Sequence, residues 1–129
     1  MATDRVLIDT SIIIDYLRKK NKKKSQFYKS VGNYTLFVST ITLFELFAGA
    51  KDERKRQDID NIMEYIKILP FTKNTAKKSG EIHQSLKNKN KLIEIKDLFI
   101  AATALSHNLP LMTLNIKHFD RIEDLNVWS

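Results

Sequence analysis

The sequence predicts an α/β fold built on a mostly parallel sheet of about four or five strands. Short apolar or β-branched runs alternate with longer amphipathic segments along the chain, which is the order of elements in parallel α/β folds. The first run, Val6–Ile8, stands between charged residues and is typical of a buried strand. The 129 residues contain three Gly and two Pro, with no repeat or linker, so we expect a single domain spanning residues 1–129.

In the first half of the chain, two strands and four helices are predicted. The strands cover residues 6–8 and 35–39, and the second is rich in β-branched and aromatic residues. The first helix begins at Ile12, with Thr10 or Ser11 as its cap, and fades into a basic segment. Apolar spacing and turn signals place the other helices over residues 25–31, 40–50 and 52–68.

The second half of the chain continues this alternation. Residues 68–71 form a short strand or turn, and an amphipathic helix follows over residues 74–88. A strand over residues 111–113 comes after Asn108-Leu109-Pro110, which breaks the preceding helix. The remaining elements are a helix over residues 95–105, a helical turn over 116–120 and an edge strand over 127–128.

The charge and composition of the chain exclude several classes of protein. The 22 Lys and Arg against 15 Asp and Glu give a net charge of +7, which favours a polyanionic partner such as nucleic acid. Cysteine is absent, so disulfide frameworks, thiolate metal sites and cysteine nucleophiles are excluded. No apolar run approaches the roughly 18 residues of a membrane span, and the first residues lack a signal-peptide pattern. We therefore expect a cytoplasmic protein with no membrane partner.

Two polar side chains follow predicted strands. Asp9 ends the first strand, and Asn115 lies two residues beyond Thr113, at the end of a later strand. Because ligands bind outside the carboxyl ends of parallel strands, we expect both side chains at the same edge of the sheet. Each residue is alternatively explained as a helix cap, a position that Asp and Asn favour.

Two further carboxylates stand beside apolar helices. Glu45 is the one charge in the helix over residues 40–50, whose apolar composition predicts burial. A buried carboxylate must pair with a cation or have a shifted pKa. Alternatively, Glu45 lies on a solvent-exposed side of the helix or pairs with a lysine. Asp97 precedes an apolar helical run, where the helix dipole favours a carboxylate, but Ile100 leaves it without a capping-box partner.

Asp9, Glu45 and Asp97 together suggest a metal site. Three carboxylates that meet in one cleft repel one another unless a cation lies between them. Oxygen ligands without His or Cys suit Mg²⁺ or Mn²⁺, and such an ion in a basic protein suggests hydrolysis of phosphodiester bonds. The separations of 36 and 52 residues match no local metal motif, so the fold must bring these residues together.

Four segments, in order and covering nearly the whole chain, carry a family resemblance. They are residues 7–17, 39–46, 95–104 and 111–115, and the ending that follows contains Phe119, Ile122, Leu125 and Trp128. In order and spacing these segments resemble the PIN-domain family and, within it, the VapC-type toxins of toxin–antitoxin pairs.

The resemblance implies a three-layer α/β/α sandwich and an endoribonuclease that depends on Mg²⁺ or Mn²⁺. By position, Asp9, Glu45 and Asp97 correspond to the catalytic, metal-binding acids of the family. Asn115 takes the fourth position, usually an Asp, as a neutral and weaker ligand. Three hydroxyl side chains would lie beside the site: Thr10, Ser11 and Thr113. The resemblance also implies an RNA substrate, a cognate VapB-like antitoxin and a homodimer.

Other residues and functions compete with this interpretation. Glu94 and Asp120 are alternative acids for the site, and we expect Asp15 to form an exposed pair with Lys19. The three His show no ligand spacing, and we expect surface or core roles for His83, His107 and His118. Two other functions stay open. One is a catalytically weak PIN-like module that binds RNA or a protein, which Asn115 favours; the other is a structure-specific DNA nuclease.

Overall fold

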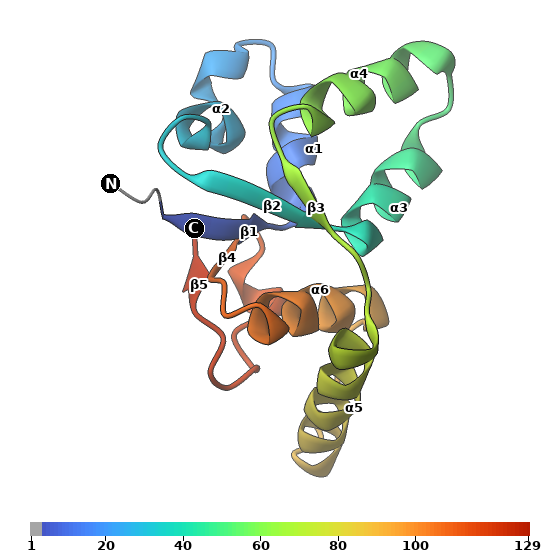
Figure 1. Ribbon diagram of the computed structural model, residues 1–129, viewed down its shortest axis with the longest axis vertical. Coiled ribbons are helices and arrows are strands. Elements are labelled where there is room, and N and C mark those ends of the chain that lie inside the picture. The colour runs from blue at the N-terminus through green and yellow to red at the C-terminus, as the bar shows by residue number, and fades with distance from the viewer. Residues whose placement is uncertain (1–3) are drawn as a thin grey trace.

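The computed structural model describes residues 4–129, and its centre is a five-stranded sheet (Figure 1). The strands lie in the order β3-β2-β1-β4-β5, and every neighbouring pair is parallel. The parallel pairing confirms the predicted parallel sheet. β1 is the central strand, and β5 is an edge strand, as predicted. The strands are β1 (Arg5–Ile8), β2 (Thr35–Ser39), β3 (Lys67–Leu69), β4 (Leu111–Met112) and β5 (Val127–Trp128).

Helices cover both faces of the sheet, which confirms the three-layer α/β/α architecture (Figure 1). One layer contains α1 (Thr10–Arg18), α2 (Gln26–Ser30), α3 (Thr40–Gly49) and α4 (Glu53–Met63). The other layer contains α5 (Lys73–Asn88) and α6 (Ile95–Ser106). Two short 3-10 helices are η1 (Lys22–Lys24) and η2 (Ile116–His118). Within residues 4–129, the helices lack the combination of length and apolar character that a bilayer crossing requires.

The side chains of β1 alternate between the two faces and divide the core. Val6 and Ile8 pack in the first helical layer, whereas Leu7 packs in the second. All three are fully buried, because helices cover both faces of a central parallel strand. The strand therefore reads as a continuous apolar run, as the sequence suggested.

The start of α1 differs from the prediction in a way that matters for the site. The helix begins at Thr10 rather than Ile12, and Asp9 takes the cap position. The Asp9 side chain makes no capping hydrogen bond, and the hydroxyls of Thr10 and Ser11 bond to carboxylates instead. These three polar side chains therefore form contacts at the edge of the sheet and do not cap the helix.

The helix predicted over residues 52–68 is also too long. α4 ends at Met63, and the chain then enters β3. Apolar spacing continues past the end of the helix, but Ile68 pairs with Val38 of β2. Sheet pairing therefore overrides the helical pattern in these residues.

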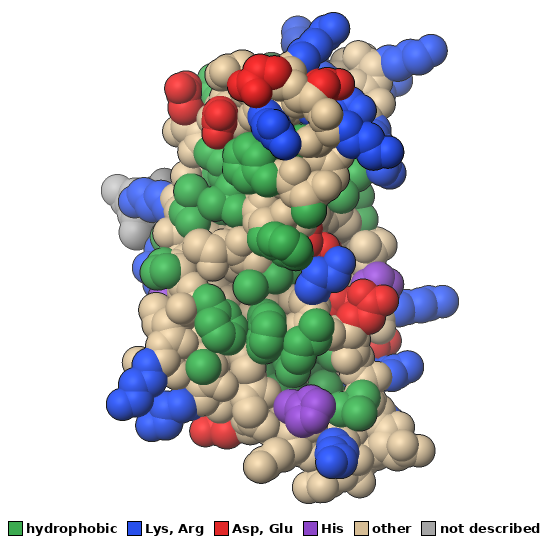
Figure 2. Space-filling view, turned by 90° about the vertical axis from the view of Figure 1, so that its right-hand side faces the viewer, with side chains coloured by type: hydrophobic (Ala, Val, Ile, Leu, Met, Phe, Trp, Pro, Cys, Tyr) green, Lys and Arg blue, Asp and Glu red, His purple; other side chains and the backbone are tan. Residues whose placement is uncertain are grey.

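The prediction that α3 is buried is wrong along one side of the helix. Thr42 and Leu46 are buried, but Phe44 is 63% exposed. Figure 2 shows apolar side chains gathered on the side of the molecule that carries α3, β3 and α6. Exposed apolar residues of these elements and of the segment after β3, here called the apolar face, are Phe44, Ile68, Phe71 and Ile95. Apolar composition alone could not distinguish a fully buried helix from a helix with one apolar side exposed to solvent.

Candidate active site

The carboxyl ends of β1 and β4 meet at one edge of the sheet, and polar residues follow both strands. Ile8 at the end of β1 pairs with Met112 at the end of β4. Asp9 and Thr113 are the next residues along the two strands, so the register makes them neighbours. This is the edge at which ligands bind in open parallel sheets.

A pocket of about 520 Å³ opens at this edge. β1 leads into it through Asp9, while α3 contributes Glu45 and α6 contributes Asp97 from its first turn. Six of the seven residues expected at the site line the pocket: Asp9, Thr10, Ser11, Glu45, Asp97 and Asn115. The seventh, Thr113, is fully buried and bonds directly to Asp9.

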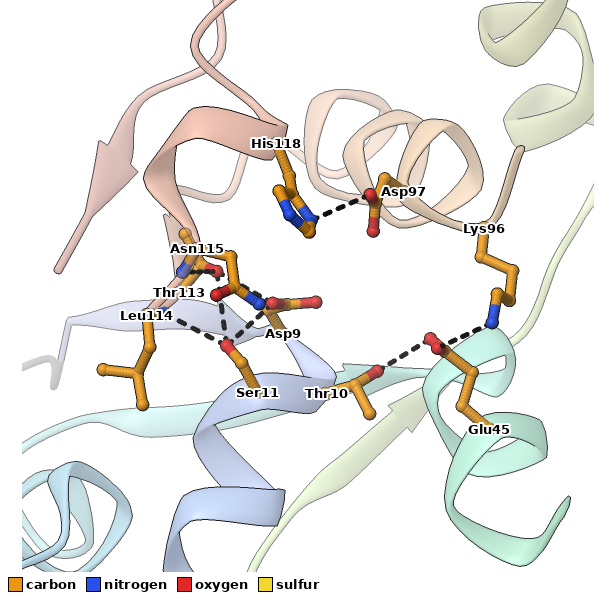
Figure 3. Close-up of polar contacts among 10 residues, drawn as sticks. All are labelled: Asp9, Thr10, Ser11, Glu45, Lys96, Asp97, Thr113, Leu114, Asn115 and His118. Carbon is orange, nitrogen blue, oxygen red and sulfur yellow. Dashed lines mark hydrogen bonds and ion pairs between the residues drawn. The ribbon is translucent and has the colours of Figure 1, made fainter. Parts of the chain in front are cut away.

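Two hydroxyl groups fix the Asp9 carboxylate, which is 4% exposed. Ser11 Oγ and Thr113 Oγ1 each donate a 2.8 Å hydrogen bond to Oδ2 of Asp9. The backbone N–H groups of Leu114 and Asn115 donate in turn to these hydroxyls, at 3.0 and 2.9 Å. In Figure 3 the other Asp9 oxygen points into the space that Asp97 and Glu45 also face. The network therefore orients Asp9 and leaves one oxygen free to act.

Glu45 is held from both sides. Thr10 Oγ1 donates a 2.9 Å hydrogen bond to Oε1, and Lys96 Nζ lies 3.4 Å from Oε2 (Figure 3). The Glu45 side chain is 21% exposed and lines the pocket. The alternative that Glu45 pairs with a lysine is thus realised, although Glu45 also lines the pocket with the other carboxylates.

Asp97 is the carboxyl group whose titration the pocket perturbs most clearly. Burial raises the pKa of Asp97 to about 6, and the nearby His118 partly opposes this shift. The negative charges of Asp9, Glu94 and Glu45 also contribute to the raised pKa of Asp97. The acids of the pocket are therefore close enough to repel one another, as the sequence suggested for a shared cleft.

His118 and Lys96 are residues of the site that sequence reasoning did not select. His118 Nδ1 lies 3.2 Å from Oδ2 of Asp97, and its ring lines the pocket although its side chain is 53% exposed. Its position three residues after Asn115, at the end of η2, is the signal that could have identified it. Asp120, the alternative fourth acid, lies on a different surface pocket with Asn90.

The remaining alternative acids lie at the rim of the pocket. Asp15 pairs with Lys19 at 2.7 Å, which confirms the expected i, i+4 pair, but the Asp15 side chain is only 18% exposed, so the expected exposure is wrong for Asp15. Both residues nevertheless line the pocket, as do Arg18 and Glu94. The pocket lining therefore carries two further acidic and two basic side chains besides the three expected carboxylates.

The donor set of the pocket fits a hard divalent cation. The three carboxylates and the Asn115 amide that line the pocket carry oxygen atoms, the kind of ligand that Mg²⁺ and Mn²⁺ prefer. As the side chains lie, no three acidic or His groups of residues 4–129 are gathered closely enough to hold one ion. Asp9 and Asp97 each have one oxygen bonded to the protein and a second that points into the open space of Figure 3. These two carboxylates are therefore the natural pair for a cation.

Comparison with known proteins identifies relatives of the whole chain. Residues 6–125 match the family model described as PIN domain. A Rickettsia bellii protein named ribonuclease VapC is 38% identical over 95% of this chain and 93% of its own length. Two solved structures have a similar fold. The Rickettsia felis VapBC2 structure, bound to a promoter DNA fragment, has a TM-score of 0.84 at 27% identity and covers 95% of this chain and 96% of its own. VapBC-1 of nontypeable Haemophilus influenzae has a TM-score of 0.84 at 31% identity and covers 97% of both chains.

Proposed function

The chain belongs to the PIN domain family, and on this premise we propose that it is the metal-dependent endoribonuclease toxin of a VapBC-type toxin–antitoxin pair. The observation that carries the proposal is the meeting of Asp9, Glu45 and Asp97, from three separate elements, around one pocket. Relatives named ribonuclease VapC and VapBC complexes of similar fold support it. The net charge of +7 also favours attraction of RNA phosphates.

Asp9 and Asp97 would hold Mg²⁺ or Mn²⁺, with Glu45 and Asn115 as further oxygen groups beside it. When bound, such an ion would supply Lewis-acid chemistry to the scissile phosphate and to an attacking water. Hydrolysis by that water leaves a 5′-phosphate and a 3′-hydroxyl on the two RNA products.

The chain's own residues bind and orient the reacting groups. Ser11 and Thr113 fix the direction of the Asp9 carboxylate through the hydrogen bonds to Oδ2. Arg18 and Lys19 at the rim attract the RNA backbone toward the pocket. The three carboxylates repel phosphate unless a cation balances their charge or a substitution removes part of it.

The proposed partners follow from the same family membership. We expect a VapB-like antitoxin that neutralises the chain, and a homodimer of the chain itself. The apolar face (Phe44, Ile68, Phe71 and Ile95) supports an association of this kind, because exposed apolar patches mark protein interfaces. This face lies beside the pocket, since α3 and α6 contribute to both.

The proposal is tested by RNA cleavage with Mg²⁺ or Mn²⁺ and with EDTA, using the wild-type chain and Asp9→Ala. Loss of one electrostatic contact to the transition state costs on the order of 10²-fold in rate, so Asp9→Ala should lose at least that much. Asp60→Ala, an exposed acid of α4, is the matched control and should cleave as the wild type does. RNA binding, measured by filter retention, should weaken little in either variant, since Asp9→Ala removes a negative charge.

Two results would overturn the proposal in different ways. Cleavage that survives both EDTA and Asp9→Ala would come from another nuclease in the preparation. RNA binding without any cleavage would favour a catalytically weak binding module. The neutral Asn115 at the fourth position favours the same alternative.

A further inference from the structure

Lys96 lies beside the acidic pocket, and its ammonium group contacts one of the pocket's carboxylates, Glu45. We propose that Lys96 is a positioning residue of the metal site: its ammonium group serves as a fixed cation for Glu45, so that the pocket binds one divalent ion, between Asp9 and Asp97, rather than two. This inference rests on the proposed function, because the ion concerned is the one that the nuclease would use.

The three carboxylates differ in which of their oxygens are occupied by the protein. The hydrogen bonds of Asp9 converge on Oδ2, and His118 contacts Oδ2 of Asp97. Glu45 has a partner on each oxygen, because Thr10 bonds to Oε1 and Lys96 lies 3.4 Å from Oε2. Glu45 is therefore the one of the three carboxylates with both oxygens in contact with other side chains.

The location of Lys96 is unfavourable for a lysine unless nearby carboxylates compensate. It is the second residue of α6, where the positive end of the helix dipole disfavours a cation. Its side chain is 47% exposed, so packing does not force it into the cleft. The ion pair with Glu45 and the charge of the adjacent Asp97 supply the compensation, and local rules are often broken in this way at functional sites.

The charge of the pocket matches a single divalent ion. Asp9, Glu45 and Asp97 contribute three negative charges, and Lys96 returns one positive charge. The rim acids Asp15 and Glu94 are matched by Arg18 and Lys19. Two negative charges therefore remain at the centre, and the neutral Asn115 adds none.

The test is Mn²⁺ binding to the metal-free full chain, measured by calorimetry and by electron paramagnetic resonance, without any RNA. The wild type should bind one Mn²⁺ per chain. Lys96→Met and Lys96→Gln should bind Mn²⁺ more tightly by on the order of tenfold, because a unit charge a few ångströms from a divalent ion is removed in a water-exposed cleft. Lys96→Arg keeps the charge and should restore wild-type affinity. Lys87→Met, in the last turn of α5, is the control and should match the wild type.

Failure of this inference can be distinguished from failure of the proposed function. Two Mn²⁺ ions per wild-type chain, or unchanged affinity in Lys96→Met and Lys96→Gln, would overturn the role of Lys96. If Asp97→Asn still abolished Mn²⁺ binding, the proposed nuclease site would stand. Unchanged Mn²⁺ affinity together with weaker RNA binding would make Lys96 a phosphate-binding residue instead. A wild-type chain that binds no Mn²⁺ would contradict both proposals.

Discussion

Thr113 donates a 2.8 Å hydrogen bond to Oδ2 of Asp9, although 104 positions separate the two residues in the sequence. The contact follows from the register of the sheet, because the preceding residues Met112 and Ile8 are paired. A single strand pairing thus sets the orientation of a carboxylate at the pocket. The fold and the site are coupled through this contact.

Replacing Thr113 by Val should destabilise the metal-free protein. The substitution preserves shape but removes a buried donor to Asp9 and the acceptor of the Asn115 N–H group. Unsatisfied buried groups of this kind cost about 1–3 kcal/mol, which urea unfolding would measure. Thr103→Val is the control, because its buried hydroxyl bonds only to the Phe99 carbonyl of its own helix. Equal losses in the two variants would mean that the contact with Asp9 has no special weight.

Divalent metal should stabilise the fold by relieving repulsion among the carboxylates. We expect Mn²⁺ or Mg²⁺ to raise the melting temperature of the wild type, because a ligand that binds only the folded state stabilises it. Asp97→Asn should abolish most of this shift. The measurement is thermal unfolding of both proteins with metal and with EDTA. An identical response to metal in the two proteins would rule out a shared ion at Asp97.

The raised pKa of Asp97 predicts how stability depends on pH. In the folded protein the pKa of Asp97 moves from 3.8 to about 6, mainly through burial. The folded state then binds this proton more tightly than the unfolded chain does, so Asp97 contributes stability at low pH that is lost as pH rises from about 4 to about 6. The Asp97→Asn variant does not lose this stability, because its side chain does not ionise.

Thermal unfolding in EDTA across this range would check the pH dependence. The melting temperature of Asp97→Asn relative to wild type should therefore increase up to pH 6 and then level off. A difference between the two proteins that is constant from pH 4 to pH 7 would contradict the raised pKa.

The exposed Phe44 side chain should matter for assembly rather than for folding. Phe44→Glu changes a residue that is 63% exposed, so the variant should fold with a stability near that of the wild type. We expect the wild type to be a dimer of the 15.0 kDa chain in light scattering, and Phe44→Glu to be a monomer. Tyr28→Glu, 49% exposed on α2, is the control and should remain dimeric. A Phe44→Glu variant that is as dimeric as the control would exclude the apolar face as the interface.

Much of the fold could be predicted from the sequence because its signals are local. Thr35–Ser39 is a strand with the predicted bounds, and α3 ends at Gly49, one residue before its predicted end. The parallel direction of the strands could be predicted from the alternation of strands and helices along the chain. The acids Asp9, Glu45 and Asp97 could be singled out because each is a charge beside an apolar element.

The features that the sequence could not give depend on tertiary structure. Lys96 and His118 are ordinary surface residues by composition, and only the approach of α6 to α3 and η2 places them on carboxylates. The exposure of Phe44 depends on what α3 packs against, which its apolar composition does not specify. Likewise, β3 replaces the end of a predicted helix because β2 offers an edge to pair with.

The central claim is that carboxylates from three segments form one catalytic site, and single-turnover cleavage of a labelled RNA tests it most directly. The isosteric variants Asp9→Asn, Glu45→Gln and Asp97→Asn remove charge while preserving shape. We predict that Asp9→Asn and Asp97→Asn lose on the order of 10²-fold or more in rate, and that Glu45→Gln loses about tenfold, with RNA affinity near wild type in all three. Wild-type cleavage rates in Asp9→Asn or Asp97→Asn, measured at the RNA and metal concentrations that saturate the wild type, would contradict the account.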